Sequence, residues 1–154
     1  MSRAFVKESD RDDVTLPDRE PSAHPNFVTA RGLAEIETRL REFEQERTQA
    51  RADGDEGRVA RAARELRYYQ ARRESARLVE PPATATAVRF GVLVHLRCAD
   101  GRALAYRIVG EDEANPAQGL LSYVSPLAQA LIGLETGDDV GLGGLRAIVE
   151  RLEV

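Results

Sequence analysis

The chain is poor in several features that often carry protein function. Its 154 residues include one cysteine, Cys98, which excludes an internal disulfide framework and a cysteine-based metal site. A reducing, cytoplasmic setting is the simplest interpretation. No apolar run approaches the roughly 18 residues of a membrane span. The polar start also lacks the apolar core of a signal peptide. We therefore expect no membrane association.

Aromatic residues and lysine are also scarce. Tryptophan is absent, aromatic residues make up 5% of the chain, and Lys7 is the only lysine among 22 basic residues. The net charge of −4 argues against general nucleic-acid binding, because such proteins carry an excess of positive charge. An apolar fraction of 42% beside 31% charged residues indicates a small core together with a highly charged helical element.

Motifs for common catalytic chemistry are missing. The two histidines, His24 and His95, have no cysteine, histidine or carboxylate partner at metal-ligand spacing. Ser122 and Ser125 have no histidine at hydrolase spacing. The glycine-rich stretch 141–145 resembles a phosphate loop but lacks the helix that should follow, so a β-turn is the better interpretation.

Four segments follow from the sequence pattern. Residues 1–28 contain three prolines and no sustained periodicity, which predicts an extended or disordered arm; its apolar cluster Ala4-Phe5-Val6 is the one part that could dock. Residues 29–79 form a helical hairpin, residues 80–87 a proline-containing linker, and residues 88–154 a small β domain.

The hairpin is predicted from two apolar seams joined by a turn. Thr29 is a candidate N-cap, and Asp53 to Gly57 form the turn. Arg73 interrupts the second seam. The spacing of three and four residues is typical of an antiparallel coiled coil. The seam positions are Leu33, Ile36, Leu40 and Phe43 in the first helix, and Val59, Ala62, Leu66, Tyr69 and Ala76 in the second.

The β domain is predicted as β-β-β-α-β-β. Alternating apolar residues indicate strands in 88–96 and 103–110, joined by a turn at Asp100-Gly101. Ser125 followed by Pro126 is a helix start. The fold class is therefore α+β: a helical hairpin followed by a small antiparallel sheet packed on one helix.

The turn of the hairpin carries three acids, Asp53, Asp55 and Glu56. Carboxylates at the end of a projecting hairpin could bind a hard cation such as Mg²⁺ if a partner supplied further ligands. The alternative is structural, since Asp and Gly favour turns and acids at a helix start suit its dipole.

Several blocks resemble the bacterial Gre transcript-cleavage and elongation factors. The most specific are "YRIVGEDEA" at 106–114 and "SPLAQAL" at 125–131, with "FVTARGLAEIETRL" at 27–40 echoing the start of the family's hairpin. The resemblance covers roughly residues 27–140. It implies an FKBP-like β domain that docks on RNA polymerase at the rim of the secondary channel. The docking residues would be Ser122, Val124, Ser125 and Pro126. The family commonly has Asp or Asn where this chain has Val124.

The resemblance also assigns a role to the turn. The family's tip carries Gly-Asp-x-x-Glu-Asn-Ala, whose two acids help hold the second catalytic Mg²⁺ of the polymerase. This chain keeps Gly54-Asp55 but has Arg58 at the second acid, and Glu56 or Asp53 would have to substitute. Asp55 is thus the one candidate metal ligand, acting in trans with the polymerase. The hairpin arms are about seven or eight residues shorter than in the family, a loss on the order of 10 Å of reach.

These observations predict an accessory elongation factor with no enzymatic activity or cofactor of its own. It would contact nucleic acid only through the elongation complex, and any RNA cleavage would be performed by the polymerase. Three alternatives remain open. The chain could be a non-cleaving relative that competes for the channel, a structural module for a non-polymerase partner, or a prolyl isomerase. The last needs an aromatic-lined pocket, and the β domain offers only Phe90, Tyr106 and Tyr123.

Overall fold

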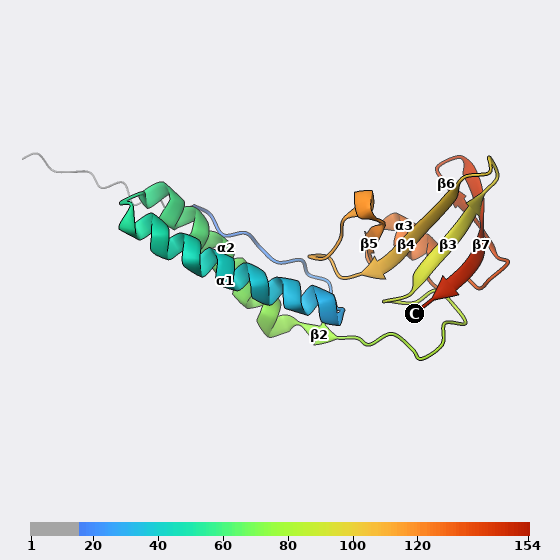
Figure 1. The fold of residues 1–154 in the computed structure, drawn as a ribbon, viewed down its shortest axis with the longest axis horizontal. Helices are drawn as coiled ribbons and strands as arrows, with labels where there is room; N and C mark the ends of the chain where they lie inside the picture. Colours follow the sequence, from blue (N-terminus) through green and yellow to red (C-terminus); the bar gives the residue numbers. More distant parts are fainter. Residues whose placement is uncertain (1–15) are drawn as a thin grey trace, which may run out of the picture.

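A computed structural model describes residues 16–154 of the chain. The apolar cluster Ala4-Phe5-Val6, singled out above for docking, lies outside the described residues. The molecule is elongated, with the helical hairpin at one end and the β domain at the other (Figure 1). Residues 16–26 run beside the hairpin as an extended segment before the first helix begins.

The hairpin consists of α1 (Ala30–Ala52) and α2 (Glu56–Ser75). Each helix begins at a side-chain cap that satisfies a free backbone N–H of the first turn. The Thr29 hydroxyl accepts from the Gly32 amide at 2.9 Å, and the Asp55 carboxylate accepts from the Arg58 amide at 3.0 Å. The predicted hairpin and its N-cap are therefore present.

The seam of α2 differs from the prediction in register. Tyr68 and Arg72 are buried, whereas Arg73 is exposed and pairs with Glu37 at 3.2 Å. We expected Arg73 to interrupt the apolar seam. That prediction was wrong by one residue, because the buried arginine of α2 is Arg72. The reason is that the base of α2 packs against the β domain as well as against α1, and Arg72 faces that contact.

A two-stranded parallel sheet joins the two ends of the hairpin at its base. It pairs β1 (Phe27–Val28) with β2 (Arg77–Leu78). The sequence pattern did not predict these strands, because two residues are too short to show a period of two. The pairing fixes the entry of α1 beside the exit of α2.

The β domain is built on a five-stranded sheet in the order β5-β4-β3-β7-β6. Neighbouring strands are antiparallel except β4 and β5, which are parallel. The loop 110–119, with a 3-10 turn at Pro116–Gln118, carries the chain back so that β5 runs beside the last three residues of β4. The strands are β3 (Leu93–Cys98), β4 (Ala103–Val109), β5 (Leu120–Ser122), β6 (Asp139–Leu142) and β7 (Leu145–Glu153).

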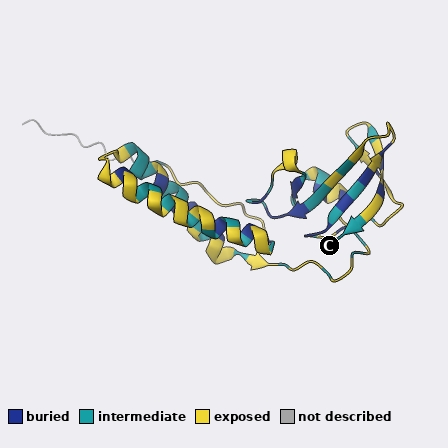
Figure 2. Cartoon of the chain, in the orientation of Figure 1, coloured by how far each residue is buried: buried dark blue, intermediate teal, exposed yellow. Residues whose placement is uncertain are grey.

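One helix, α3 (Pro126–Leu131), covers the sheet and closes its core. Alternate residues of β3 point inward, as the period of two predicts, while the other face is partly open to solvent (Figure 2). The core includes Val94, Leu96, Ile108, Ala128, Leu131 and Val149, all fully buried. The expected fold class, a helical hairpin followed by a small β domain with one helix, is confirmed.

None of the helices in residues 16–154 is both long enough and apolar enough to cross a membrane.

Candidate functional site

The turn at the end of the hairpin is tight and its geometry is set by three residues. Asp53 is the C-cap of α1, Gly54 takes a left-handed conformation with φ +67°, and Asp55 is the N-cap of α2. A residue with a side chain rarely adopts that φ, so glycine is required at position 54. Because Asp55 Oδ1 accepts from the Arg58 amide, one of its two oxygens is engaged in the cap.

Arg58, which occupies the place of the second tip acid, holds two carboxylates. Its Nε donates to Glu46 at 2.9 Å and its Nη1 donates to Asp53 at 2.8 Å. The other oxygen of Asp53 accepts from Gln49 at 2.9 Å. Hydrogen bonds from Arg58 and then from Gln49 lower the pKa of Asp53, and the two carboxylates raise the pKa of Arg58. We call Arg58 with Asp53 and Glu46 the tip clamp.

The three candidate acids differ in how many of their carboxylate oxygens are already hydrogen-bonded. Asp53 has both oxygens occupied by donors, and Asp55 has one occupied by the helix cap. The side chain of Glu56, in the first turn of α2, makes no hydrogen bond within residues 16–154. No group of three or more His, Cys, Asp or Glu side chains in that part of the chain is arranged to hold a metal ion. The tip acids are therefore close in sequence but do not form a ligand set by themselves.

The candidate docking residues lie together where β5 leads into α3. Ser122 ends β5, and its carbonyl accepts from the Ser125 amide at 2.9 Å. The Ser125 hydroxyl caps α3 by accepting from the Ala128 amide at 3.3 Å. Pro126 is the first residue of the helix and is exposed, while Val124 is half-buried. The structure thus gathers the four expected residues on one corner of the domain.

An apolar groove of about 500 Å³ opens beside this corner. Pro126 and Leu127 of α3 form one wall, and Leu104 and Tyr106 of β4 line it as well. Gly141 of β6 and Gly143 of the following turn also line the groove. The groove could accept apolar side chains of a partner next to the exposed Pro126.

The loop after β4 holds the hairpin against the β domain. Asp112 accepts from the Tyr68 hydroxyl at 2.5 Å and from Arg72 Nε at 2.5 Å. Arg72 is 1% exposed, and its Nη2 also lies 3.5 Å from Glu111. Burial, with the hydrogen bond to Asp112, raises the pKa of Tyr68 to about 12. The carboxylate of Asp112 therefore accepts the hydrogen bonds of two α2 side chains, Tyr68 and Arg72.

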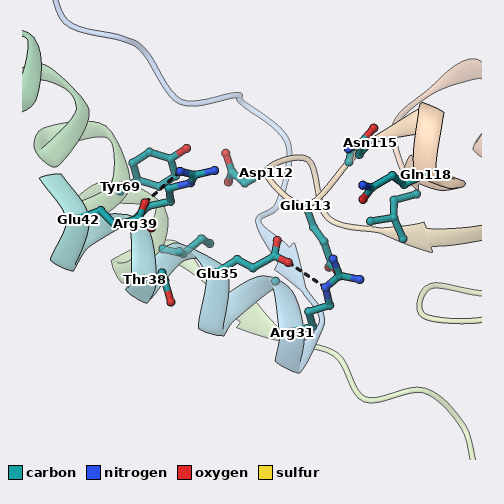
Figure 3. Close-up of a pocket in the computed structure, with 14 residues that line it drawn as sticks. Arg31, Glu35, Thr38, Arg39, Glu42, Tyr69, Asp112, Glu113, Asn115 and Gln118 are labelled. Carbon is teal, nitrogen blue, oxygen red and sulfur yellow. Dashed lines mark hydrogen bonds and ion pairs between the residues drawn. The ribbon is translucent and has the colours of Figure 1, made fainter.

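The neighbouring Glu113 fixes the other helix. Its carboxylate accepts from the Thr29 hydroxyl at 2.6 Å, so the N-cap of α1 is also tied to the β domain. A Cβ at Gly32 would lie 2.7 Å from Glu113 Oε2, and a Cβ at Gly110 would lie 2.4 Å from the Phe27 carbonyl. The backbone carbonyl of Phe27 cannot move aside as a side chain can, so the approach at Gly110 requires glycine. Figure 3 shows Asp112 and Glu113 extending from the loop toward the hairpin. They line a polar cleft of about 440 Å³.

This junction was missed in the analysis of the sequence. The block "GEDEA" was recognised only as a loop and as a family echo, and its three acids received no role. The available signal was the arginine in the apolar seam of α2, which needs a buried carboxylate partner.

Three aromatic rings complete the junction. Phe27 packs on Phe90 and Tyr123 at centroid distances of 6.3 and 5.4 Å, and the Tyr123 hydroxyl donates to the carbonyl of Pro25. Phe90 and Tyr123 thus face the hairpin base, and only Tyr106 of the three aromatic residues in the β domain lines the apolar groove. An aromatic-lined pocket for prolyl isomerisation is not formed there.

Residues 83–150 match the family described as "Transcription elongation factor, GreA/GreB, C-term". Transcription elongation factor GreA of Desulfovibrio desulfuricans is 34% identical over 126 residues, covering 80% of this chain and 74% of the relative. GreA of Alkalilimnicola ehrlichii is 39% identical over 132 residues, covering 72% of this chain and 84% of the relative.

A solved structure of the Thermus thermophilus GreA factor homolog 1 (Gfh1) also aligns, with a TM-score of 0.42 and 19% identity over 85% of this chain and all of that one. The family assignment depends on the sequence relatives, which match across both the hairpin and the β domain. The chain belongs to the GreA/GreB family of transcription elongation factors.

Proposed function

We propose that this chain binds RNA polymerase at the secondary channel and modulates elongation without lending a ligand to the second catalytic Mg²⁺. The β domain would dock at the channel rim through Ser122, Val124, Ser125 and Pro126, and the hairpin would enter the channel. The exposed Pro126 and the apolar groove beside it support this docking surface, since a partner side chain could be buried there.

The tip clamp is the observation that carries the non-cleaving mechanism. Two-metal hydrolysis requires carboxylates around the second cation. Here Arg58 stands where the family has the second acid, and its positive charge is held at the tip by Asp53 and Glu46. A guanidinium has no lone pair with which to bind Mg²⁺, and the clamp also engages Asp53, one of the two possible substitutes.

Hairpin length supports the same conclusion. The 23 residues of α1 and the 20 residues of α2 are about 35 and about 30 Å long at 1.5 Å per residue. With arms about seven or eight residues shorter than those of the family, the tip would stop on the order of 10 Å short of the metal. The hairpin would then occupy the channel and exclude other factors.

A second candidate function is stimulation of cleavage, and one observation favours it. Asp55 keeps one oxygen without a hydrogen bond within the described part of the chain, and Glu56 beside it is unpaired there. These two acids could join ligands supplied by the polymerase. In either version the chain is an accessory factor, and hydrolysis of the RNA belongs to the polymerase active site.

A backtracked elongation complex with labelled RNA tests the mechanism. Incubated with this chain, the RNA should keep its length, whereas a cleavage-stimulating factor shortens it. Shortening by this chain that disappears in Asp55→Ala would establish the second candidate function and overturn the first. The Arg58→Glu variant restores the family's acid and separates the contribution of the tip chemistry from that of arm length.

Binding is tested separately, by capture of core RNA polymerase on the immobilised chain. Pro126→Asp should abolish capture because it places a charge in the proposed contact. Ile148→Asp is the matched control, since Ile148 is also exposed, at 50%, but lies on β7 away from α3. Capture that survives Pro126→Asp, or no capture by the unaltered chain, would favour a module for a different partner.

A further inference from the structure

The extended segment before α1 runs along α2 of the hairpin. Arg19 donates to Glu65 at 3.0 Å and lies over the ring of Tyr68, 3.7 Å from its centroid. Asp18 pairs with Arg67 at 2.6 Å. Nearer the hairpin base, the side chain of Asn26 donates to the carbonyl of Arg72 at 2.6 Å. Toward its start, the segment therefore runs along α2 in the direction of the tip (Figure 1).

Beyond Arg19, a groove lined by both helices has no occupant among residues 16–154. Glu65, which binds Arg19, also lines this groove, so the segment leads to it. Positions 58, 61, 62 and 65 of α2 lie on one face at spacings of three and four, and that face continues to Tyr68 and Tyr69. The groove has a volume of about 540 Å³ and is lined by Phe43, Glu46, Arg58, Arg61, Ala62, Arg64 and Glu65.

The charge of this groove is positive. Its two acids are already paired, Glu46 with Arg58 and Glu65 with Arg19. Arg61 and Arg64 form no ion pair within the described residues, and Arg64 Nε is buried there without a hydrogen-bond partner. We call this surface the arginine groove. It offers two unpaired guanidinium groups beside the apolar surface of Phe43 and Ala62.

The chain itself contains a segment of matching charge. Residues 8–13 read Glu-Ser-Asp-Arg-Asp-Asp, with four carboxylates and one arginine. From Glu65 to Arg58 the groove extends over seven residues of α2, about 10 Å. The six residue-to-residue steps from Asp13 to Arg19 can span at most about 20 Å, so the acids reach the groove.

We propose that residues 8–13 dock in the arginine groove of their own hairpin, where their carboxylates pair with Arg61 and Arg64. Such docking covers the groove and places negative charge beside the tip clamp. The inference is independent of polymerase binding, because it concerns only contacts within this chain.

A paramagnetic label tests the proposal in the full chain. Ser9→Cys carries a nitroxide at the centre of the segment and keeps all four acids; Cys98 is buried, and its replacement by alanine makes the labelling specific. The expected result is amide broadening concentrated at residues 58–65, and weaker at high salt because ions screen the pairing. Broadening that is absent, or equal along the whole hairpin, overturns the proposal.

Charge reversal gives the matched comparison. Arg61→Glu with Arg64→Glu should abolish the broadening, and reversing the four acids to lysine in the same protein should restore it. Arg41→Glu with Arg51→Glu changes the charge equally on exposed positions outside the groove and should leave the broadening unchanged. Loss of broadening in this control contradicts a specific contact.

A mixed sample distinguishes a contact between molecules. One batch of the chain carries the nitroxide but no ¹⁵N, and a second batch carries ¹⁵N but no nitroxide. When the two are mixed, only a contact between molecules broadens the ¹⁵N signals. No broadening is expected in the mixture. If the mixture shows broadening as large as that in the chain carrying both labels, the groove binds a second copy, and intramolecular docking is overturned.

Discussion

Arg58 is the residue that decides how the tip behaves. Its guanidinium holds Asp53 and Glu46, so the positive charge that replaces the family's second acid is fixed in position by neighbouring carboxylates. Exposed ion pairs contribute little to folding stability. The consequence of the tip clamp therefore concerns metal binding, because a guanidinium has no lone pair for a cation and Arg58 engages one oxygen of Asp53.

The pKa of Asp53 reports the tip clamp directly. Arg58→Gln should raise that pKa toward its ordinary value, because the largest cause of its lowering is the hydrogen bond from Arg58. With a lowered folded pKa, the contribution of Asp53 is present above its ordinary pKa and disappears as the pH falls through the folded value. A carboxyl-detected NMR titration measures this. Arg61→Gln is the control, and a pKa unchanged by Arg58→Gln would contradict the tip clamp.

Val124 is the second residue with a testable consequence. The family commonly has Asp or Asn there, and a carboxylate would restore a polar contact with the polymerase. Val124→Asp should tighten binding by about tenfold, in line with the roughly 1.5–3 kcal/mol of a hydrogen bond to a charged group. Titration of labelled chain with core polymerase measures the dissociation constant. Weaker binding would show that Val124 is buried by apolar contact.

At the scale of elements, the junction between the hairpin and the β domain depends on one buried ion pair. The guanidinium of Arg72 and the carboxylate of Asp112 are both removed from solvent, with side chains 2% and 9% exposed. Removing one partner of such a pair leaves an unpaired buried charge, which usually costs more than the pair contributed.

Arg72→Ala should therefore lower the free energy of unfolding by about 3–5 kcal/mol. Arg73→Ala is its control, because Arg73 is the exposed neighbour on the same helix and pairs with Glu37 at the surface. Urea unfolding followed by the helical circular dichroism signal compares the two. Equal small losses in both variants would mean that the junction does not depend on Arg72.

A substitution at Gly110 tests the close approach of the loop after β4 to the backbone of β1. A Cβ there would lie 2.4 Å from the backbone carbonyl of Phe27, which cannot rotate away. Gly110→Ala should cost about 1–3 kcal/mol and separate β1 from the loop after β4. Hydrogen exchange at the Val79 amide, which donates to the Val28 carbonyl at 2.9 Å, should become faster. Unchanged exchange would contradict the predicted displacement.

Much of this architecture follows from local sequence patterns, and the exceptions have physical causes. The helix caps at Thr29 and Ser125 and the glycine turn between β6 and β7 were predictable, because each depends on neighbouring residues. The burial of Arg72 and the role of Asp112 were not, since the two groups lie 40 residues apart. The tip clamp was missed for a similar reason: a spacing pattern shows Arg58 in place of an acid but not its pairing with Glu46.

At the scale of the molecule, the two ends are held in a defined arrangement. The segment before α1 contacts α2 and the β domain, β1 pairs with β2, and the acids of the loop after β4 hold both helices. A hairpin fixed in this way would be directed by the β domain when that domain docks. Blocking the channel then requires only that the hairpin enters it, without chemistry at the tip.

Competition on a backtracked elongation complex tests this central claim most directly. The chain is titrated against a fixed amount of a cleavage-stimulating Gre factor, and the length of labelled RNA is followed. RNA shortening should stop as this chain is added; Pro126→Asp should remove the inhibition, and Asp55→Ala should leave it intact. Shortening by this chain alone, lost in Asp55→Ala, would contradict the non-cleaving mechanism.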